Sequence, residues 1–274
     1  MYIDSHAHLF FDNYGSDLEA VLDRSVRSGI QAIVVPGTNL KTSREAVDLA
    51  HRFPFLHACV GIHPHAASAV TDEDLSAIDA LSASQGIVAI GEIGLDYHYD
   101  FSPRERQHEI FHNQISLAAK RNLPIVVHTR ESMTDAIEMV TNGVREFPLW
   151  TPGIAGNPSR GVFHCFTGTA EEAQTLFSLG FYVSFPGIVT FKNSPVHDTL
   201  RAIGSGRILL ETDSPYLTPV PHRGKRNEPS YIPLIAKSVA DVLQSSTDDI
   251  ARMTTGNAMN LFSITTHVRA TQHI

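Results

Sequence analysis

Short apolar segments that each end on a histidine or a carboxylate are the feature of this chain that most restricts its fold. The segments read YIDSHAHL, FLHACVGIHPH, GIVAIGEIGLDY, LPIVVHTR, GVFHCFTG and RILLETDSPYL. The side chains at or near their ends are His6, His8, His63, Glu92, His128, His164 and Asp213. In a (β/α)8 barrel the carboxyl ends of the strands converge on one face, which carries the active site. The pattern therefore predicts an α/β TIM barrel with a metal centre on that face.

Strand-like and helix-like stretches alternate along the chain, as a parallel barrel requires. Strands are expected near residues 2–9, 30–36, 55–62, 86–92, 124–129, 161–166, 181–186 and 207–212. Helices are expected near residues 16–28, 42–52, 71–84, 103–122, 131–146, 169–179, 195–204, 230–244 and 247–262. No long linker or internal repeat interrupts this alternation, so we expect one domain over residues 1–264 and a C-terminal tail over 265–274.

Several predicted helix ends carry a local signal. Ser102-Pro103-Arg104-Glu105 and Thr169-Ala170-Glu171-Glu172 have the spacing of a capping box, the first with Pro at the first helical position. Gly29, Gly180 and the stretch Asn122-Leu123-Pro124 are typical of helix stops.

Length and composition narrow the class of protein. A chain of 274 residues suits one barrel, which typically has about 250 residues. Cys59 and Cys165 are the only cysteines and have no CxxC spacing, so neither a disulfide framework nor a cysteine-based zinc site is expected. No signal sequence or bilayer-spanning apolar stretch is visible, and we expect a cytoplasmic monomer that does not contact a membrane.

The net charge of -8 argues mildly against a nucleic-acid partner, because such proteins usually carry a basic surface. Two divalent cations in the site would weaken that objection, since they would be its largest local charges.

Residues 147–160, FPLWTPGIAGNPSR, are rich in Pro and Gly and contain the only Trp. They follow a predicted helix and precede a predicted strand, which places them at the amino-terminal face of the barrel, opposite the chemistry. A partner-contact loop around Trp150 is one interpretation. A surface insertion is favoured, because long loops cost little stability.

Residue type and spacing support metal ligation unequally at the different positions. His6 and His8 are two residues apart, so on a strand both side chains point to one face and can bind the same ion. Glu92 and Asp213 each end an apolar strand, where a carboxylate is costly to bury unless it is paired or bound to metal. A structural salt bridge is the alternative for Asp213.

His128 and His164 end their strands alone, and a hydrogen-bonded core histidine is the alternative for each. Their repeated position at strand ends is what favours ligation. Glu211 should share a face with Asp213 if the strand is regular, and we expect it to support the site.

The motifs HAHL, GIHPH, GEIGLDYH, HTR, FHCFTG and ETDSPYLTP, followed by RGKRNEP, resemble those of the TatD family of metal-dependent deoxyribonucleases, within the amidohydrolase-like barrel superfamily. The resemblance runs from residue 4 to about residue 260 and keeps the family's order and spacing. It implies a binuclear centre with His6, His8 and Asp213 on one metal, His128 and His164 on the other, and Glu92 bridging. It also implies that His63 and the loop Arg223-Gly224-Lys225-Arg226 face the scissile phosphate.

Imidazole and carboxylate ligands suit Zn, Mn or other first-row ions, with Mg tolerated in the carboxylate-rich half. Two ions about 3.5–4 Å apart can activate a water and clamp the oxygens of a phosphodiester. Asp213 would accept the proton of the nucleophile, and Glu92 would hold the ions at their working separation. A covalent mechanism is not expected, because Cys165 should point to the other side of its strand from His164.

The basic loop is the main indication of substrate. His222 to Asn227 follow the last strand, and barrels often bind phosphate with the loops after strands 7 and 8. A solvated surface loop is the alternative for such a charge cluster. Around the site, stacking on unpaired bases is expected from aromatic side chains of two segments, Tyr97, His98 and Tyr99 in the first and Phe185 and Phe191 in the second.

These features together predict a metal-dependent deoxyribonuclease, a 3′-5′ exonuclease on single-stranded DNA or frayed ends that acts in DNA repair or degradation. Two rivals remain. A small-molecule amidohydrolase or lactonase would use similar metals, but commonly bridges them with a carboxylated Lys, and no Lys ends the fourth or fifth strand. A D-aminoacyl-tRNA deacylase would keep both the metals and the phosphate contacts. A protein that binds without catalysis is the weakest interpretation, because every expected ligand is present.

Overall fold

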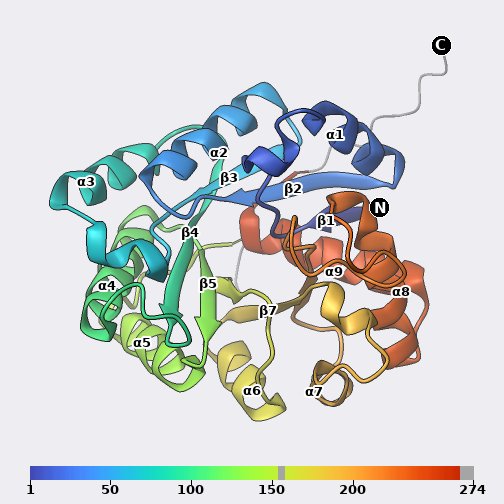
Figure 1. The fold of residues 1–274 in the computed structure, drawn as a ribbon. Coiled ribbons are helices and arrows are strands. Elements are labelled where there is room, and N and C mark those ends of the chain that lie inside the picture. The colour runs from blue at the N-terminus through green and yellow to red at the C-terminus, as the bar shows by residue number, and fades with distance from the viewer. Residues whose placement is uncertain (154–157, 266–274) are drawn as a thin grey trace.

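Eight parallel strands in sequence order form the centre of the computed structural model, which describes residues 1–153 and 158–265 (Figure 1). The strands are β1 Tyr2–Asp4, β2 Ile30–Pro36, β3 Leu56–Val60, β4 Ile87–Asp96, β5 Ile125–Arg130, β6 Gly161–Phe163, β7 Phe181–Phe185 and β8 Ile208–Leu210. Neighbouring strands pair from β1 through to β8. The predicted single-domain TIM barrel is confirmed.

Backbone hydrogen bonds just beyond the short first and last strands close the seam of the barrel. The amide of Ser5 donates to the carbonyl of Leu210 at 3.0 Å, and the amide of Asp213 donates to His6 at 2.9 Å. Ala7 and Ser214 form an isolated parallel bridge in the same seam. The segments that carry His6, His8 and Asp213 are therefore held side by side although they lie outside the strands.

Helices follow the strands around the outside of the barrel (Figure 1). They are α1 Leu18–Arg27, α2 Leu40–Arg52, α3 Asp72–Leu81, α4 Arg104–Arg121, α5 Met133–Glu146, α6 Ala170–Ser178, α7 Val196–Ile203, α8 Ile232–Leu243 and α9 Thr247–Phe262. The described residues also form four 3-10 turns, η1 Asp12–Tyr14, η2 Pro64–Ala69, η3 Gly187–Thr190 and η4 Pro229–Tyr231. Within the described residues, no helix is long and apolar enough to cross a bilayer.

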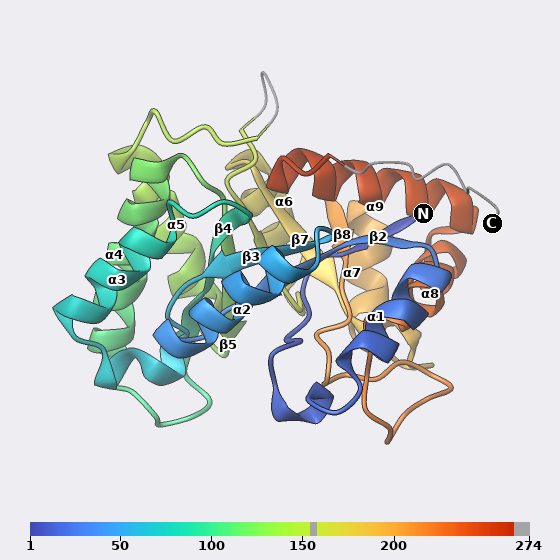
Figure 2. The same cartoon turned by 90° about the horizontal axis from the view of Figure 1, so that it is seen from above.

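The apolar core has two layers, as a barrel with outer helices requires. One layer fills the space between strands and helices, with members such as Val35, Ile115 and Leu176. The other lies inside the barrel, where strand residues such as Val34 and Leu209 meet α9. Figure 2 shows α9 across one end of the barrel, so this helix covers the end opposite the predicted metal centre.

The helix signals predict most of the observed ends correctly. Thr169 accepts a hydrogen bond from the amide of Glu172 at 3.2 Å in the predicted capping box. Gly29, Gly180 and Asn122 all have a positive φ at helix ends, with values of 85°, 87° and 50°. The expected capping box at Ser102 is wrong, because its hydroxyl instead donates to the carbonyl of His65 and accepts from the amide of Ser68. Pro103, extended, takes the N-cap position.

Several strands end earlier or later than the sequence predicts. β1 ends at Asp4, β6 at Phe163 and β8 at Leu210, so His6, His8, His164 and Asp213 come after the strands. β4 instead continues to Asp96, through Glu92, with an irregular register between Ile90 and Ile93. Alternation along a strand therefore explains fewer side-chain directions than expected.

Trp150 is buried, with 1% of its surface exposed, so the partner-contact interpretation of this side chain is wrong. Its indole nitrogen donates to the carbonyl of Leu123 at 2.8 Å, and its ring packs edge-on against Phe181. Residues 154–157 of the same loop, and residues 266–274 of the expected C-terminal tail, lie outside the described residues.

Candidate metal centre

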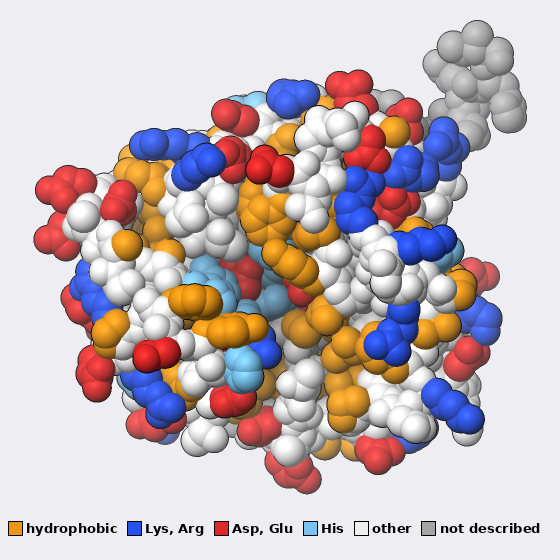
Figure 3. All heavy atoms as spheres, in the orientation of Figure 1, with side chains coloured by type: hydrophobic (Ala, Val, Ile, Leu, Met, Phe, Trp, Pro, Cys, Tyr) orange, Lys and Arg blue, Asp and Glu red, His pale blue; other side chains and the backbone are white. Residues whose placement is uncertain are grey.

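The carboxyl ends of the strands gather all seven predicted side chains into one group. His128 lies in β5 and Glu92 in β4, while His6, His8, His63, His164 and Asp213 lie just after the strands that precede them. Figure 3 shows a hollow in the middle of this face, with histidine and acidic side chains at its floor and hydrophobic side chains around it. The structure thus brings together residues that are up to 207 positions apart in the chain, from His6 to Asp213.

One half of the group surrounds oxygen Oε2 of Glu92. The Nε2 atoms of His6 and His8 lie 3.1 Å from each other and 3.4 and 3.5 Å from this oxygen. Oδ1 of Asp213 lies 3.7 Å from both imidazole nitrogens. We call these four residues the first half of the centre.

The other oxygen of Glu92, Oε1, faces the second half, His128 and His164. Nδ1 of His128 lies 3.1 Å and Nε2 of His164 3.0 Å from Oε1, and the two nitrogens are 3.4 Å apart. Nε2 of His63 also approaches Oε1, at 3.3 Å. Glu92 is nearly fully buried, so one carboxylate lies between two groups of imidazoles and contacts both.

The spacing of these donors fits divalent ions. Donors at about 2.0–2.1 Å from a tetrahedral metal lie about 3.3–3.4 Å from one another. The distances in the first half are 3.1 to 3.7 Å, and those around Oε1 in the second half are 3.0 to 3.4 Å. Neutral imidazoles and carboxylates are also the ligand types of zinc and neighbouring ions.

The outer ring nitrogens of the histidines support the same conclusion. Nδ1 of His8 lies 3.3 Å from the carbonyl oxygen of Pro36, and Nε2 of His128 lies 3.1 Å from the carboxylate of Asp96. Each acceptor places the ring proton on the outer nitrogen and leaves a lone pair facing inward. This is the arrangement that histidines bound to metal usually adopt.

The ring proton of His63 lies on the inward nitrogen, the opposite of the arrangement at His8 and His128. Its Nδ1 accepts a hydrogen bond from the amide of His65 at 3.2 Å, so the neutral ring carries its proton on Nε2, which faces the centre. Burial lowers the pKa of His63 to about 4, which keeps the ring neutral. A proton on the inward nitrogen suits a hydrogen bond to a phosphate oxygen rather than a bond to a metal.

The structure adds two residues to the site, Asp96 and His65, that were not predicted from the sequence. Oδ2 of the buried Asp96 carboxylate lies 2.8 Å from Nε2 of His65 and 3.1 Å from Nε2 of His128. Asp96 lies four positions after Glu92 in β4, a spacing that places two side chains on the same face of a strand. His65 repeats the two-residue histidine spacing of His6 and His8. Both signals were present in the sequence.

Burial and mutual charge shift the pKa values of the centre. Burial lowers the pKa of His8 to about 3 and raises that of Asp213 to about 8. Burial disfavours the charged form of Glu92, but the surrounding histidines outweigh it and hold its pKa well below the usual range. At His164, burial is likewise outweighed by the charges of Glu92 and Glu211, and its pKa lies well above the usual range.

Glu211 is fully buried beneath the second half. Its carboxylate accepts hydrogen bonds from the amide of Cys165 at 2.6 Å and the hydroxyl of Ser184 at 2.5 Å. The same carboxylate lies 3.6 Å from Nδ1 of His164. These contacts place Glu211 behind His164, the supporting position expected for it, although β8 ends before it and strand alternation is not the reason.

The structure removes the basis for the expected direction of Cys165. β6 ends at Phe163 and Cys165 has a φ of 47°, so strand alternation does not apply to it. Burial raises the pKa of the Cys165 thiol well above its usual range, and the charges of Asp213, Glu211 and Glu92 raise it further. The thiol therefore stays protonated, which argues against a covalent cysteine mechanism on different grounds.

The basic loop after β8 divides into two parts. Arg223 and Lys225 are exposed, and the Arg223 guanidinium lies 4.3 Å above the ring of Phe191. Arg226 instead makes two hydrogen bonds to the carboxylate of Asp17, at 2.8 and 2.7 Å. Its charge is already paired, which counts against the phosphate contact predicted for it.

The aromatic side chains named from the sequence also divide. The hydroxyl of Tyr97 hydrogen-bonds to His108 and Asp135, and the guanidinium of Arg104 lies 4.1 Å from the centre of the Tyr97 ring. Phe185 is fully buried. Neither ring has a free face for a base. Tyr99 is 41% exposed at the rim of the hollow, where His65 packs against it.

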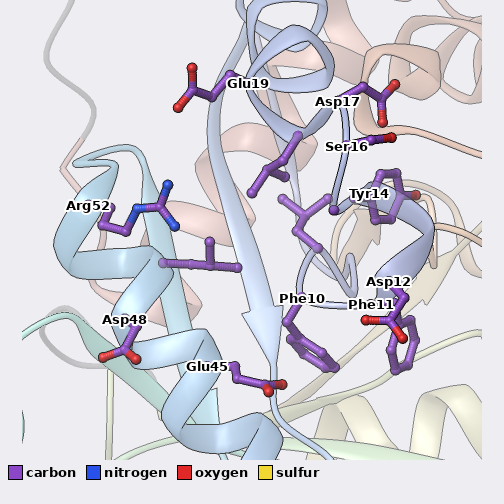
Figure 4. Close-up of a pocket in the computed structure, with 14 residues that line it drawn as sticks. Phe10, Phe11, Asp12, Tyr14, Ser16, Asp17, Glu19, Glu45, Asp48 and Arg52 are labelled. Carbon is purple, nitrogen blue, oxygen red and sulfur yellow. The ribbon is translucent and has the colours of Figure 1, made fainter.

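A second hollow of about 500 Å³ lies between α1 and α2 (Figure 4). Five carboxylates line it together with one arginine, and they are Asp12, Asp17, Glu19, Glu45, Asp48 and Arg52. Phe10 and Phe11 separate it from the ring of His8. The excess of negative charge opposes the binding of a phosphate there, so the histidine-lined hollow is the candidate active site.

Comparison with known proteins gives one consistent family. Residues 3–263 match the family model of TatD related DNases. The uncharacterized metal-dependent hydrolase YabD of Bacillus subtilis is 42% identical over 265 residues, which cover 96% of this chain and 100% of YabD. The 3′-5′ ssDNA/RNA exonuclease TatD of Edwardsiella piscicida is 32% identical over 269 residues, which cover 96% of this chain and 99% of that protein.

A solved structure has the same fold over almost the whole chain. The crystal structure of YJJV, a TatD homolog from Escherichia coli, superposes with a TM-score of 0.87 at 26% identity. The match covers 96% of this chain and 98% of YJJV. The fold predicted from the sequence is thus shared with that homolog over nearly all of both chains.

Proposed function

The chain belongs to the TatD-related DNase family of metal-dependent hydrolases, and from this premise we propose that it is a nuclease that removes nucleotides from the 3′ end of single-stranded DNA. The observation that carries the proposal is the Glu92 carboxylate, whose two oxygens face separate groups of imidazoles. A site that holds two cations side by side suits a phosphodiester, because it can neutralise both the attacking and the leaving oxygen.

In this proposal His6, His8 and Asp213 would hold one divalent ion, His128 and His164 would hold the other, and Glu92 would contribute to both. The donor set suits zinc, manganese or magnesium. When bound, such ions lower the pKa of a water molecule and stabilise the charge of the phosphate.

Two of the chain's own groups would then act on the substrate. Asp213 is more exposed than Glu92, with 14% against 4% of its side chain accessible, so it can reach an incoming water and accept its proton. His63 would donate a hydrogen bond from Nε2 to an oxygen of the scissile phosphate, while keeping its proton. Arg223 and Lys225 on the rim would bind other phosphates of the same strand.

The strand preference and the polarity have separate support. The donors lie at the floor of a hollow, which admits a frayed or unpaired end more easily than an intact duplex (Figure 3). The 3′ polarity is carried over from the Edwardsiella piscicida relative, whose name also includes RNA. A nuclease of this kind acts in DNA repair or degradation, which is the role we propose.

The proposal is tested with oligonucleotides labelled at the 5′ or the 3′ end. Protein reconstituted with zinc, manganese or magnesium should shorten single-stranded DNA stepwise from its 3′ end and act slowly on blunt duplex. RNA of the same sequence, a D-aminoacyl-tRNA and a lactone are assayed in parallel. Rapid cutting within intact duplex, or turnover of the last two substrates alone, would overturn it.

A further inference from the structure

Two exposed aromatic rings and one arginine stand at the rim of the hollow, on the side of β4 and β5. Tyr99 and Phe101 are 41% and 58% exposed, and their rings are 5.2 Å apart and stacked, with an interplanar angle of 25°. Both belong to the loop that joins β4 to α4. Phe101 stacks on the Tyr99 ring and Arg130 lies over the same ring, so the more exposed Phe101 ring is the one on which a further flat group can stack.

Arg130 at the end of β5 completes the group. Its guanidinium lies 4.7 Å from the centre of the Tyr99 ring. In residues 1–153 and 158–265, no ion pair joins Arg130 to a carboxylate, unlike Arg226 with Asp17. A guanidinium held over a ring without a carboxylate partner is suited to bind phosphate.

The loop that carries the two rings is already fixed in this structure. Oδ1 of Asp96 accepts hydrogen bonds from the amides of His98 and Tyr99 at 3.0 and 3.2 Å. The side chain of Gln107 bonds to both backbone groups of Asp96 and to the carbonyl of Ser102. A binding surface that is ordered in advance loses less entropy when its ligand arrives.

The same carboxylate connects the loop to the metal centre. Oδ2 of Asp96 bonds to His65 and His128, and the His65 ring packs edge-on against Tyr99 and Phe101 at 5.4 and 4.8 Å. His65 and His128 are 6.2 Å apart between ring centres. The aromatic pair therefore lies one ring away from a predicted metal ligand, within the length of a nucleotide.

We propose that Tyr99, Phe101 and Arg130 form a subsite for one unpaired nucleotide next to the scissile phosphate. The base stacks on the exposed Phe101 ring, with Tyr99 behind it, and Arg130 binds the phosphate of that nucleotide. This inference rests on the proposed nuclease function and adds the residues that select unpaired strands, since a base within a duplex has no free face. Stacking of this kind is sequence-tolerant, because every base has a flat face.

A double-mutant cycle tests the subsite, in which one change is made in the protein and the other in the oligonucleotide substrate. The substrates are thymidine oligonucleotides with one abasic position, placed successively further from the cleaved end. In the wild type, one abasic position should lower kcat/KM by about tenfold, the size of one lost base–aromatic stack. The Tyr99→Leu/Phe101→Leu variant should lose a similar factor on the intact strand and be insensitive to the same abasic position.

Arg130 is tested with a matched control. Arg130→Gln should raise KM and flatten the dependence of log KM on log salt by about 0.7, the value for one phosphate bound on a single strand. Arg52 also lies over an aromatic ring, 5.1 Å from Phe53, but at the end of α2 that is remote from the hollow. Arg52→Gln should leave both quantities unchanged.

Fluorescence of 2-aminopurine at the sensitive position gives a signal that needs no turnover. With chelator present, the wild type should quench this fluorescence on binding, and the Phe101→Leu single variant should not. The subsite is wrong if the variant and the abasic position lower kcat/KM by independent factors that multiply. It is also wrong if no abasic position changes kcat/KM of the wild type. Failure of the wild type to cleave any oligonucleotide would instead overturn the proposed function.

Discussion

The two halves of the candidate metal centre share one carboxylate but are supported differently. In the second half, His128 and His164 have carboxylates behind them, Asp96 at 3.1 Å and Glu211 at 3.6 Å. In the first half, the outer nitrogen of His8 faces only a backbone carbonyl at 3.3 Å. Within the described residues, neither Nδ1 of His6 nor Nδ1 of His164 has a hydrogen-bond partner, so the contact between His128 and Asp96 is the clear difference between the halves.

This difference changes the electrostatics of the imidazoles. Burial alone would lower the pKa of every histidine here, and it does so at His6 and His8. At His128 burial lowers the pKa, but the hydrogen bonds to Asp96 and Glu92 together with the charge of Glu92 outweigh it and raise the pKa. A carboxylate behind a histidine makes it a more basic ligand. The second half therefore depends on outer side chains that can be removed by mutation, while the first half depends on Glu92 and Asp213 themselves.

The largest effect is expected from Glu92→Gln, because both halves use its charge. We expect kcat/KM to fall by about a thousandfold or more, which corresponds to several kcal/mol of lost transition-state stabilisation. His8→Ala and His128→Ala serve as comparisons, since each removes a ligand from one half only. Equal losses in all three variants would argue against a bridging carboxylate.

Asp213→Asn should have the next largest effect and act on the first half. Loss of a general base lowers kcat by about 10²–10⁴-fold, and we expect a decrease in this range with little change in KM. Asp12→Asn is the matched control, because Asp12 is an exposed carboxylate that lines the second hollow. An Asp213→Asn variant that changes KM alone would contradict the role as base.

Asp96→Asn should act on the second half through His128. Loss of an outer partner of a metal-bound histidine typically lowers metal affinity by about 10–100-fold. Competition with a fluorescent chelator should show weaker binding of one ion and unchanged binding of the other. Glu131→Gln removes the partner of the exposed His98 on the same face and should change neither. Weakening of both ions by Asp96→Asn would show that the two halves are not independent.

The smallest effect on chemistry is expected from the rim, which belongs to neither half. Arg223→Ala/Lys225→Ala should raise KM and flatten the salt dependence of binding by about 0.7 for each phosphate that is no longer bound, with kcat preserved. Arg226→Ala should leave the salt dependence almost unchanged, because Asp17 already pairs its charge. Steady-state kinetics across a salt series decide between the two. If Arg226→Ala changes the slope of the salt dependence more than Arg223→Ala/Lys225→Ala does, then Arg226 binds phosphate and the other two residues do not.

Much of the metal centre could be predicted from sequence, because its seven side chains follow apolar stretches that are typical of barrel strands. What could not be predicted depends on contacts between distant segments. The pairing of Arg226 with Asp17 joins residues 209 positions apart and has no local signal. Cys165 has a φ of 47° and its amide bonds to Glu211, because β6 stops two residues earlier, at a point that the apolar pattern does not mark.

Asp96 and His65 are a different case, since their spacing from Glu92 and His63 was visible. The fourth strand was predicted to end at residue 92, which placed Asp96 in a loop. The shared face of Glu92 and Asp96 was therefore not predicted. The structure continues β4 to Asp96, where Gln107 bonds to its backbone. A strand end set by a side chain of the following helix is a long-range property, which the periodicity of the strand does not contain.

The bridging role of Glu92 is tested most directly by anomalous scattering from crystals grown with Zn²⁺. We expect two peaks, one on each side of the Glu92 carboxylate. The first should lie about 2.0–2.2 Å from the Nε2 atoms of His6 and His8, and the second at a similar distance from Nδ1 of His128 and Nε2 of His164. A single peak, or two peaks that do not both contact Glu92, would contradict the bridging role.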